Sequence, residues 1–133
     1  MKDMFNQVYP FLVNILQTTE NILLFESSTF TIQQMIEWIL GNADANMDAL
    51  MEILIQKLSH PNPKIQQATV SCISAFIEEG EDRMANYYDV IIQSICQCFG
   101  FYNVFLIHSL THSHIHYLIH SFTISLTHSL SHS

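Results

Sequence analysis

The sequence predicts an all-α fold of antiparallel helix hairpins that repeat along the chain. Apolar residues recur at helical spacing in five segments before residue 100, and no alternating strand pattern competes with them. Gly41 and Gly80, which both follow apolar segments, lie 39 residues apart, and Met47 follows Phe5 by 42 residues. Repeated hairpins of roughly 40–47 residues stack side by side. We therefore expect an α-α superhelix.

The first hairpin is expected within residues 3–40. Residues 3–17 form its first helix, in which Pro10 either kinks the helix or marks its true start. Residues 20–40 form the second helical stretch, which Gly41 ends, and the hydroxyl side chains at positions 27–29 predict a break in its middle. The apolar positions are Phe5, Val8, Leu12, Ile15 and Leu16 in the first helix, and Ile22, Phe25, Ile32, Met35, Ile36, Ile39 and Leu40 in the second.

The second hairpin is the most informative part of the sequence. Residues 47–58 form one helix, with Asn46 as its N-cap, and residues 63–79 form the next, with Gly80 as a stop signal. The second helix carries an apolar stripe of Ile65, Ala68, Cys72, Ile73, Phe76 and Ile77. A fifth helix is expected from about residue 83 to 99.

A helix, a proline-containing turn and a helix with a small residue early in it are typical of a HEAT or armadillo-like repeat. Such a unit cannot bury its apolar face alone and has to stack on its neighbours. We predict that residues 1–99 form a solenoid fragment of about two and a half repeats. Because neither end carries a capping repeat, we expect open apolar faces and association.

Composition limits the functions that the chain can have. The net charge of −8, from 12 acidic and 4 basic residues, disfavours direct nucleic-acid binding and favours a basic partner. Three cysteines and no secretory signal indicate a reducing compartment. No nucleotide-binding loop and no nucleophile–histidine–acid set is apparent, so we predict no enzyme activity and no cofactor. The apolar run at 99–107 is too short to span a membrane.

Residues 100–133 form a separate low-complexity tail rich in His, Ser, Thr and Leu. Residues 90–133 contain no Asp, Glu, Lys or Arg, and histidine recurs at multiples of four from His108 to His132 except at Ile124. We interpret this tandem repeat as a translated short nucleotide repeat, and so as an artefact of the gene model. The alternative is that the histidine stripe has adventitious metal affinity. We predict no evolved metal site, because no carboxylate lies nearby to orient the imidazole rings.

Three features allow two interpretations each. The acidic cluster, consisting of Glu78, Glu79, Glu81 and Asp82, either attracts a basic signal or is a solvated loop. Trp38, the single tryptophan, either lines a ligand groove or packs in the core. The Cys96-Gln97-Cys98 spacing is poor for metal binding and favours buried structural thiols.

Residues 5–99 resemble HEAT repeats of the importin-β family, and transportins in particular. Thr29–Ile39 is similar to a transportin helix with the pattern Cys-Trp-Thr-Leu-x-x-Tyr-x-x-Trp-Val, and Leu50–Leu54 is similar to the family's next helix. Lys64–Ala68 resembles its Arg-Val-Gln-Glu-Ala, and Ser74–Glu79 its small-residue run ending in consecutive Glu.

The resemblance implies a protein-binding fragment of a nuclear import receptor, active in cytoplasm and nucleus, that recognises nuclear localisation signals of cargo. The cargo-binding positions that it implies are Phe30, where the family has Trp, Gln34, where it has Arg, and Ala68, Ala75 and Glu78. Ran GTPase would bind only through repeats that are absent here, because Met1 falls inside a mid-solenoid helix. A HEAT-repeat scaffold without a transport role is the competing interpretation.

Overall fold

The computed structural model describes residues 2–99, and all regular secondary structure in this range is helical, which confirms the all-α prediction. The α-helices are α1 (Lys2–Thr18), α2 (Ile22–Gln33), α3 (Ile36–Leu40), α4 (Met47–Lys57), α5 (Pro63–Gly80) and α6 (Ala85–Phe99), and the 3-10 turns are η1 (Ala43–Ala45) and η2 (Glu81–Met84). The predictions for the tail, its histidines and the metal affinity lie outside the described residues.

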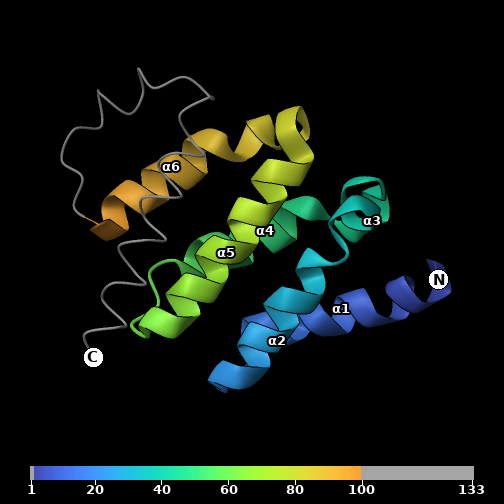
Figure 1. The fold of residues 1–133 in the computed structure, drawn as a ribbon, viewed down its shortest axis with the longest axis horizontal. Coiled ribbons are helices and arrows are strands. Elements are labelled where there is room, and N and C mark those ends of the chain that lie inside the picture. The colour runs from blue at the N-terminus through green and yellow to red at the C-terminus, as the bar shows by residue number, and fades with distance from the viewer. Residues whose placement is uncertain (1, 100–133) are drawn as a thin grey trace.

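The helices form two antiparallel hairpins that lie side by side (Figure 1). Helix α1 packs against α2, and α4 packs against α5. The most extensive contact joins α2 to α5, while α4 also touches α1 and α6. The second helices of the two hairpins therefore form one layer, and the first helices form the other. A superhelix would need further hairpins, and it stays a prediction.

One contiguous apolar core lies between these layers. Phe25 of α2 and Phe76 of α5 are 1% and 0% exposed and are the largest fully buried side chains. The predicted stripe of α5 is confirmed, except that Ala68 is only half-buried. Other members of the core are Leu12, Leu16, Ile32, Met35, Ile36, Ile39, Leu50, Met51, Leu54, Leu58, Ile91, Ile92 and Ile95.

Asparagine side chains begin three of the helices. Asn21 accepts a hydrogen bond from the Leu24 N–H of α2 at 3.0 Å, and Asn62 accepts one from the Lys64 N–H of α5 at 2.8 Å. Asn46, the predicted N-cap of α4, accepts from the Ala49 N–H at 3.3 Å and has a left-handed backbone (φ 53°), which asparagine tolerates well.

The predicted break at residues 27–29 is wrong, because the helix continues to Gln33. The Thr29 hydroxyl donates to the Glu26 carbonyl at 2.9 Å, and the Thr31 hydroxyl donates to the Ser27 carbonyl at 2.9 Å. Each hydroxyl therefore finds its acceptor on the preceding turn of the same helix, and the helix continues through these residues. The break falls instead at positions 34–35, where α2 ends and α3 begins.

Pro10 lies inside α1 and does not mark its start. A proline removes one backbone donor from a helix interior, which usually kinks or breaks the helix. Here α1 continues from Lys2 to Thr18 through this position, and its buried face is supplied by Tyr9, Leu12 and Leu16. Packing of this buried face of α1 against its neighbouring helices therefore outweighs the tendency of proline to break a helix.

Gly80 ends α5 as predicted, but the reason is a close approach of neighbouring side chains. A Cβ atom at Gly80 would lie 2.5 Å from Met84 Cγ and 3.3 Å from Leu40 Cδ1. The positive φ at this turn belongs to the next residue, Glu81, at 48°. The absence of a side chain at Gly80 thus lets the turn into η2 fold back onto α3.

We predict that Gly80→Ala destabilises the fold. Crowding at a packed position costs about 1–3 kcal/mol, which exceeds the gain of up to ~1 kcal/mol in helix propensity. Urea denaturation followed by circular dichroism measures the change. The same substitution in a Met84→Ala background is the control, since removing Met84 Cγ removes the nearest contact. An equal loss in both backgrounds would contradict the steric explanation.

Two tyrosines attach α6 to the rest of the fold. Tyr87 Oη donates to the Asp48 carboxylate of α4, and Tyr88 Oη donates to the Glu81 carbonyl at 2.8 Å. Burial, the hydrogen bond to Asp48 and the charge of Asp48 together raise the pKa of Tyr87 from 10.0 to about 12. The neutral phenol is therefore the form that the fold favours, and its contribution to stability is complete below pH 10 and lost as the pH rises through about 12.

We predict that Tyr87→Phe lowers the free energy of unfolding by about 1 kcal/mol at pH 7, the usual value of one such hydrogen bond. The difference from the wild-type chain should shrink above pH 10, because the wild-type phenol then ionises. Urea denaturation at pH 7 and at pH 11 measures it, and the other titrating groups cancel in the comparison. Asp48→Asn, which keeps an acceptor without charge, should move the decline to lower pH. A difference that does not depend on pH would refute the assignment.

Candidate functional site

A groove lies between α2 and α5, where the second helices of the two hairpins meet. Its volume is about 260 Å³. Helix α2 contributes Glu26, Thr29, Phe30 and Gln33, and α5 contributes Lys64, Gln67, Ala68 and Ser71. Ala68 and Ser71 are small, so α5 leaves space beside the larger side chains of α2. The groove is therefore open to solvent while the core beneath it is closed.

Phe30 is the principal apolar side chain of this groove. It is 63% exposed, although its neighbour Thr29 is buried. An aromatic ring presented to solvent beside a hollow is a common anchor for a protein partner. One acidic and one basic side chain, Glu26 and Lys64, accompany it. The arrangement can accept an apolar side chain of a ligand between polar groups of both signs.

The structure brings together two of the five predicted cargo-binding residues. Phe30 and Ala68 line the same groove, and Gln34, Ala75 and Glu78 do not line it. Gln34 is exposed and caps α2, with its N–H bonded to the Phe30 carbonyl at 3.3 Å. Half-buried Ala75 lies seven residues beyond Ala68, which places both on one side of α5, and exposed Glu78 follows three residues later. Phe30 and Ala68 thus share the groove, whereas Ala75 and Glu78 lie farther along α5 and Gln34 follows the end of α2.

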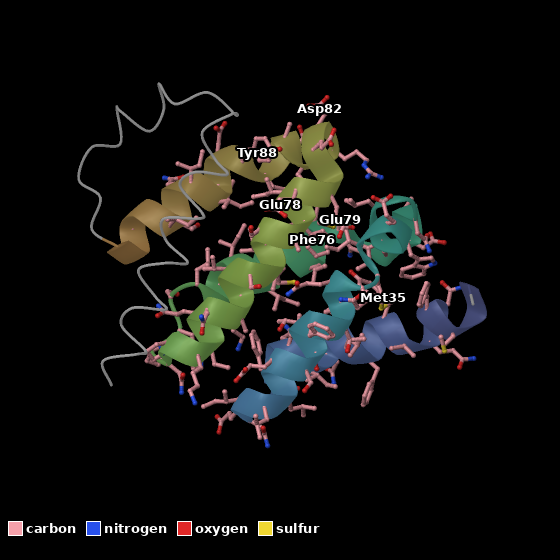
Figure 2. All side chains as sticks on the ribbon, viewed as in Figure 1. Met35, Phe76, Glu78, Glu79, Asp82 and Tyr88 are labelled. Carbon is pink, nitrogen blue, oxygen red and sulfur yellow. The ribbon has the colours of Figure 1, made fainter. Side chains whose placement is uncertain are left out.

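The acidic cluster lies at the C-terminal end of α5, where Figure 2 labels Glu78 and Glu79 on the last part of the helix and Asp82 in the turn that follows. All four of its carboxylate side chains are exposed. The pKa of Tyr88 is raised by burial first and then by the negative charges of Asp82 and Glu81. The field of the cluster is therefore felt by a neighbouring side chain, and it would also attract a basic ligand.

Arg83 offsets part of this negative charge from within the chain. Its guanidinium donates to the carbonyl of Glu79 at 3.2 Å and to the carbonyl of Gly80 at 3.4 Å, both at the end of α5. It also pairs with Glu37 of α3 at 3.2 Å. Cations at a helix C-terminus complement the helix dipole, so Arg83 stabilises an end that the acidic cluster disfavours.

Trp38 packs against α1 and also lines a second pocket. Its ring packs edgewise with Phe5 and Tyr9 of α1, at centroid distances of 5.6 and 5.5 Å. The same side chain is half-buried and lines a second pocket of about 320 Å³ together with Asn6, Glu37, Gly41 and Asn42. It is thus a packing residue with a solvent-facing part.

The titratable side chains inside the core are not arranged for nucleophilic chemistry. Cys72 is buried, and burial raises the pKa of its thiol from 9.0 to about 12, so it carries its proton at neutral pH. Tyr9 Oη is buried without a hydrogen-bond partner, and burial, then Cys72, raise its pKa to about 12. Over residues 2–99, no group of three or more His, Cys, Asp or Glu side chains could hold a metal ion.

Two polar contacts between residues far apart in the sequence were not predicted. Arg83 pairs with Glu37 across 46 positions, and Tyr87 bonds to Asp48 across 39. Both separations are close to the repeat period, so each contact joins one hairpin to the element one repeat later. A search for complementary polar residues one period apart could have found them.

Comparison with protein families, with curated proteins and with solved structures gives no match for this chain. No helix within the described part of the chain combines the length and apolar character needed to cross a membrane. The proposed function is therefore based on the sequence and on the geometry of the structure.

Proposed function

We propose that residues 2–99 are a protein-binding segment of a transportin-like nuclear import receptor, which moves between cytoplasm and nucleus and recognises nuclear localisation signals of cargo. The observation that carries this proposal is the exposed ring of Phe30 beside small Ala68 in the groove between α2 and α5. The resemblance to the importin-β family implies cargo contacts at both of these positions.

In this function an extended cargo segment lies along the layer formed by α2 and α5. The Phe30 ring stacks on an apolar or proline side chain of the segment, and Ala68 leaves room for its backbone. Farther along α5, Glu78 attracts a basic residue of the signal. An unstructured signal loses conformational entropy when it binds, so affinity has to come from many weak contacts along several repeats.

The net charge of −8 supports a basic signal as the ligand. Exposed carboxylates contribute mainly to the rate of encounter and to the choice of partner, and little to the affinity of a single contact. Binding should therefore weaken as the salt concentration rises, because exposed charges more than about 8–10 Å apart are screened at physiological ionic strength.

A HEAT-repeat scaffold without a transport role is the second candidate. It is favoured by exposed apolar side chains on the first hairpin, Met4 and Phe11 of α1, which are 53% and 65% exposed. A scaffold would use these surfaces for lateral packing and would not require Phe30. The two functions therefore differ in the residue on which binding depends.

We predict that the chain binds a fluorescein-labelled peptide carrying a basic proline-tyrosine signal, and that Phe30→Ala weakens this binding about 10-fold. This loss is typical of truncating an aromatic anchor. Fluorescence anisotropy at low salt measures the affinity, which we expect to be weak for two hairpins.

Leu23→Ala is the matched control for the peptide experiment. Leu23 lies on the same helix as Phe30 and is 75% exposed, but it does not line the groove. Its truncation should leave the affinity unchanged, and Glu78→Lys should lower it. Equal losses for Leu23→Ala and Phe30→Ala, or no binding of the peptide, would overturn the transport proposal and leave the scaffold function.

A further inference from the structure

The pocket around Trp38 is distinct from the groove between α2 and α5. Its lining residues are Asn6 of α1, Glu37 and Trp38 of α3, and Gly41 and Asn42 after α3. None of them lines the groove. At about 320 Å³ the pocket lies at the small end of the range for ligand sites, a size that suits one long side chain.

An indole ring held in place forms one wall of this pocket. Phe5 and Tyr9 pack against Trp38 at interplanar angles of 62° and 64°, so the ring is fixed from the side of α1. Its remaining surface is available to the pocket, since the side chain is only half-buried. Trp presents the best aromatic face for a cation, and a fixed ring loses little freedom on binding.

A carboxylate stands beside the indole ring. The Glu37 side chain is 69% exposed, and both of its oxygens accept hydrogen bonds from Arg83 Nη2, at 3.2 and 3.4 Å. Arg83 does not line the pocket, so it reaches Glu37 from outside it. A carboxylate has about four lone-pair sites, which leaves capacity for a second guanidinium on the pocket side.

We propose that the Trp38 pocket binds the guanidinium of an arginine side chain presented by a protein partner. A guanidinium is planar, stacks on an indole face and can form two parallel hydrogen bonds with a carboxylate, whereas an ammonium is a compact, strongly hydrated charge. Asn6 and Asn42 also line the pocket and carry amide oxygens, each of which has two lone pairs that can accept hydrogen bonds. The proposal uses no residue of the cargo groove and does not depend on the transport function.

The test uses the full chain and the peptide N-acetyl-Gly-Arg-Gly-amide. Trp38 is the only tryptophan, so a change in intrinsic fluorescence reports directly on this pocket. We expect the arginine peptide to bind at least about 10-fold more tightly than the citrulline peptide, which has the same shape without charge. We expect the lysine peptide to bind more weakly than the arginine peptide. Equal affinities for arginine and citrulline, or for arginine and lysine, would overturn the proposal.

Three variants separate binding from stability. Glu37→Gln should abolish the preference for arginine over citrulline, but it also breaks the ion pair with Arg83. Arg83→Gln breaks the same ion pair and leaves the carboxylate in place, so it should bind the arginine peptide as tightly as the wild-type chain or more tightly. Asn42→Asp adds a carboxylate and can still accept from the Asp44 N–H, as Asn42 does at 3.0 Å, so it should bind more tightly. An equal loss in Glu37→Gln and Arg83→Gln would show that only folding had changed, and it would refute the site.

Discussion

The contact between α2 and α5 is the constraint on which the rest of the structure depends. Each hairpin alone would leave a wide apolar face in water, and this contact is the most extensive between helices of the described chain. Phe25 of α2 and Phe76 of α5, one from each of these helices, are almost completely buried in the fold. Truncating a buried phenylalanine costs about 3–5 kcal/mol in typical cores, which is comparable to the whole stability of a small domain. Neither hairpin is therefore expected to keep its geometry without the other.

This contact also contains hydroxyl groups whose hydrogen bonds are made within their own helices. Thr29 of α2 bonds to the carbonyl of Glu26 at 2.9 Å, and Thr69 of α5 bonds to the carbonyl of Ile65 at 2.7 Å. Both threonines are buried, and an unpaired hydroxyl there would carry a desolvation cost. Because each bond is local, neither threonine needs a hydrogen-bond partner on the opposite helix. The groove above them then follows from side-chain size, because α5 places Ala68 and Ser71 where α2 places Phe30.

Helical spacing predicted where the helical segments of residues 2–99 lie, because periodicity depends only on which positions are buried, but it joined α2 and α3 into one stretch. Asn46 could also be identified as an N-cap from the sequence, because its side chain bonds to a backbone N–H only three residues later. The break at positions 34–35 could not be predicted, because the apolar pattern of residues 20–40 runs across it without interruption. Pro10 left two alternatives open, and the sequence alone could not choose between them, since tertiary packing decides whether a helix continues through a proline.

The candidate site was predictable only in part, and the limit has a physical cause. Phe30 and Ala68 were placed together by a resemblance, and the structure finds them on one groove because they lie on helices of adjacent hairpins. The pocket at Trp38 requires α1 and α3 to converge, and neither Asn6 nor Trp38 belongs to the apolar stripes of the first hairpin. Periodicity indicates which face of a helix is buried, but it does not indicate where two packed helices move apart. Pockets form where helices move apart, so they depend on the angles between helices and on residues that the apolar pattern omits.

The exposed apolar residues of α1 follow from the same packing principle. Met4 and Phe11 lie seven residues apart and so share one side of the helix, while Tyr9, Leu12 and Leu16 face the core. A helix that is apolar on two sides buries one of them against its own hairpin partner and leaves the other for a further layer. In a stacked array the next hairpin would cover this second side, as α5 covers α2 here. An open face of this kind favours a neighbouring hairpin over a small ligand, whereas the groove and the Trp38 pocket lie where helices meet.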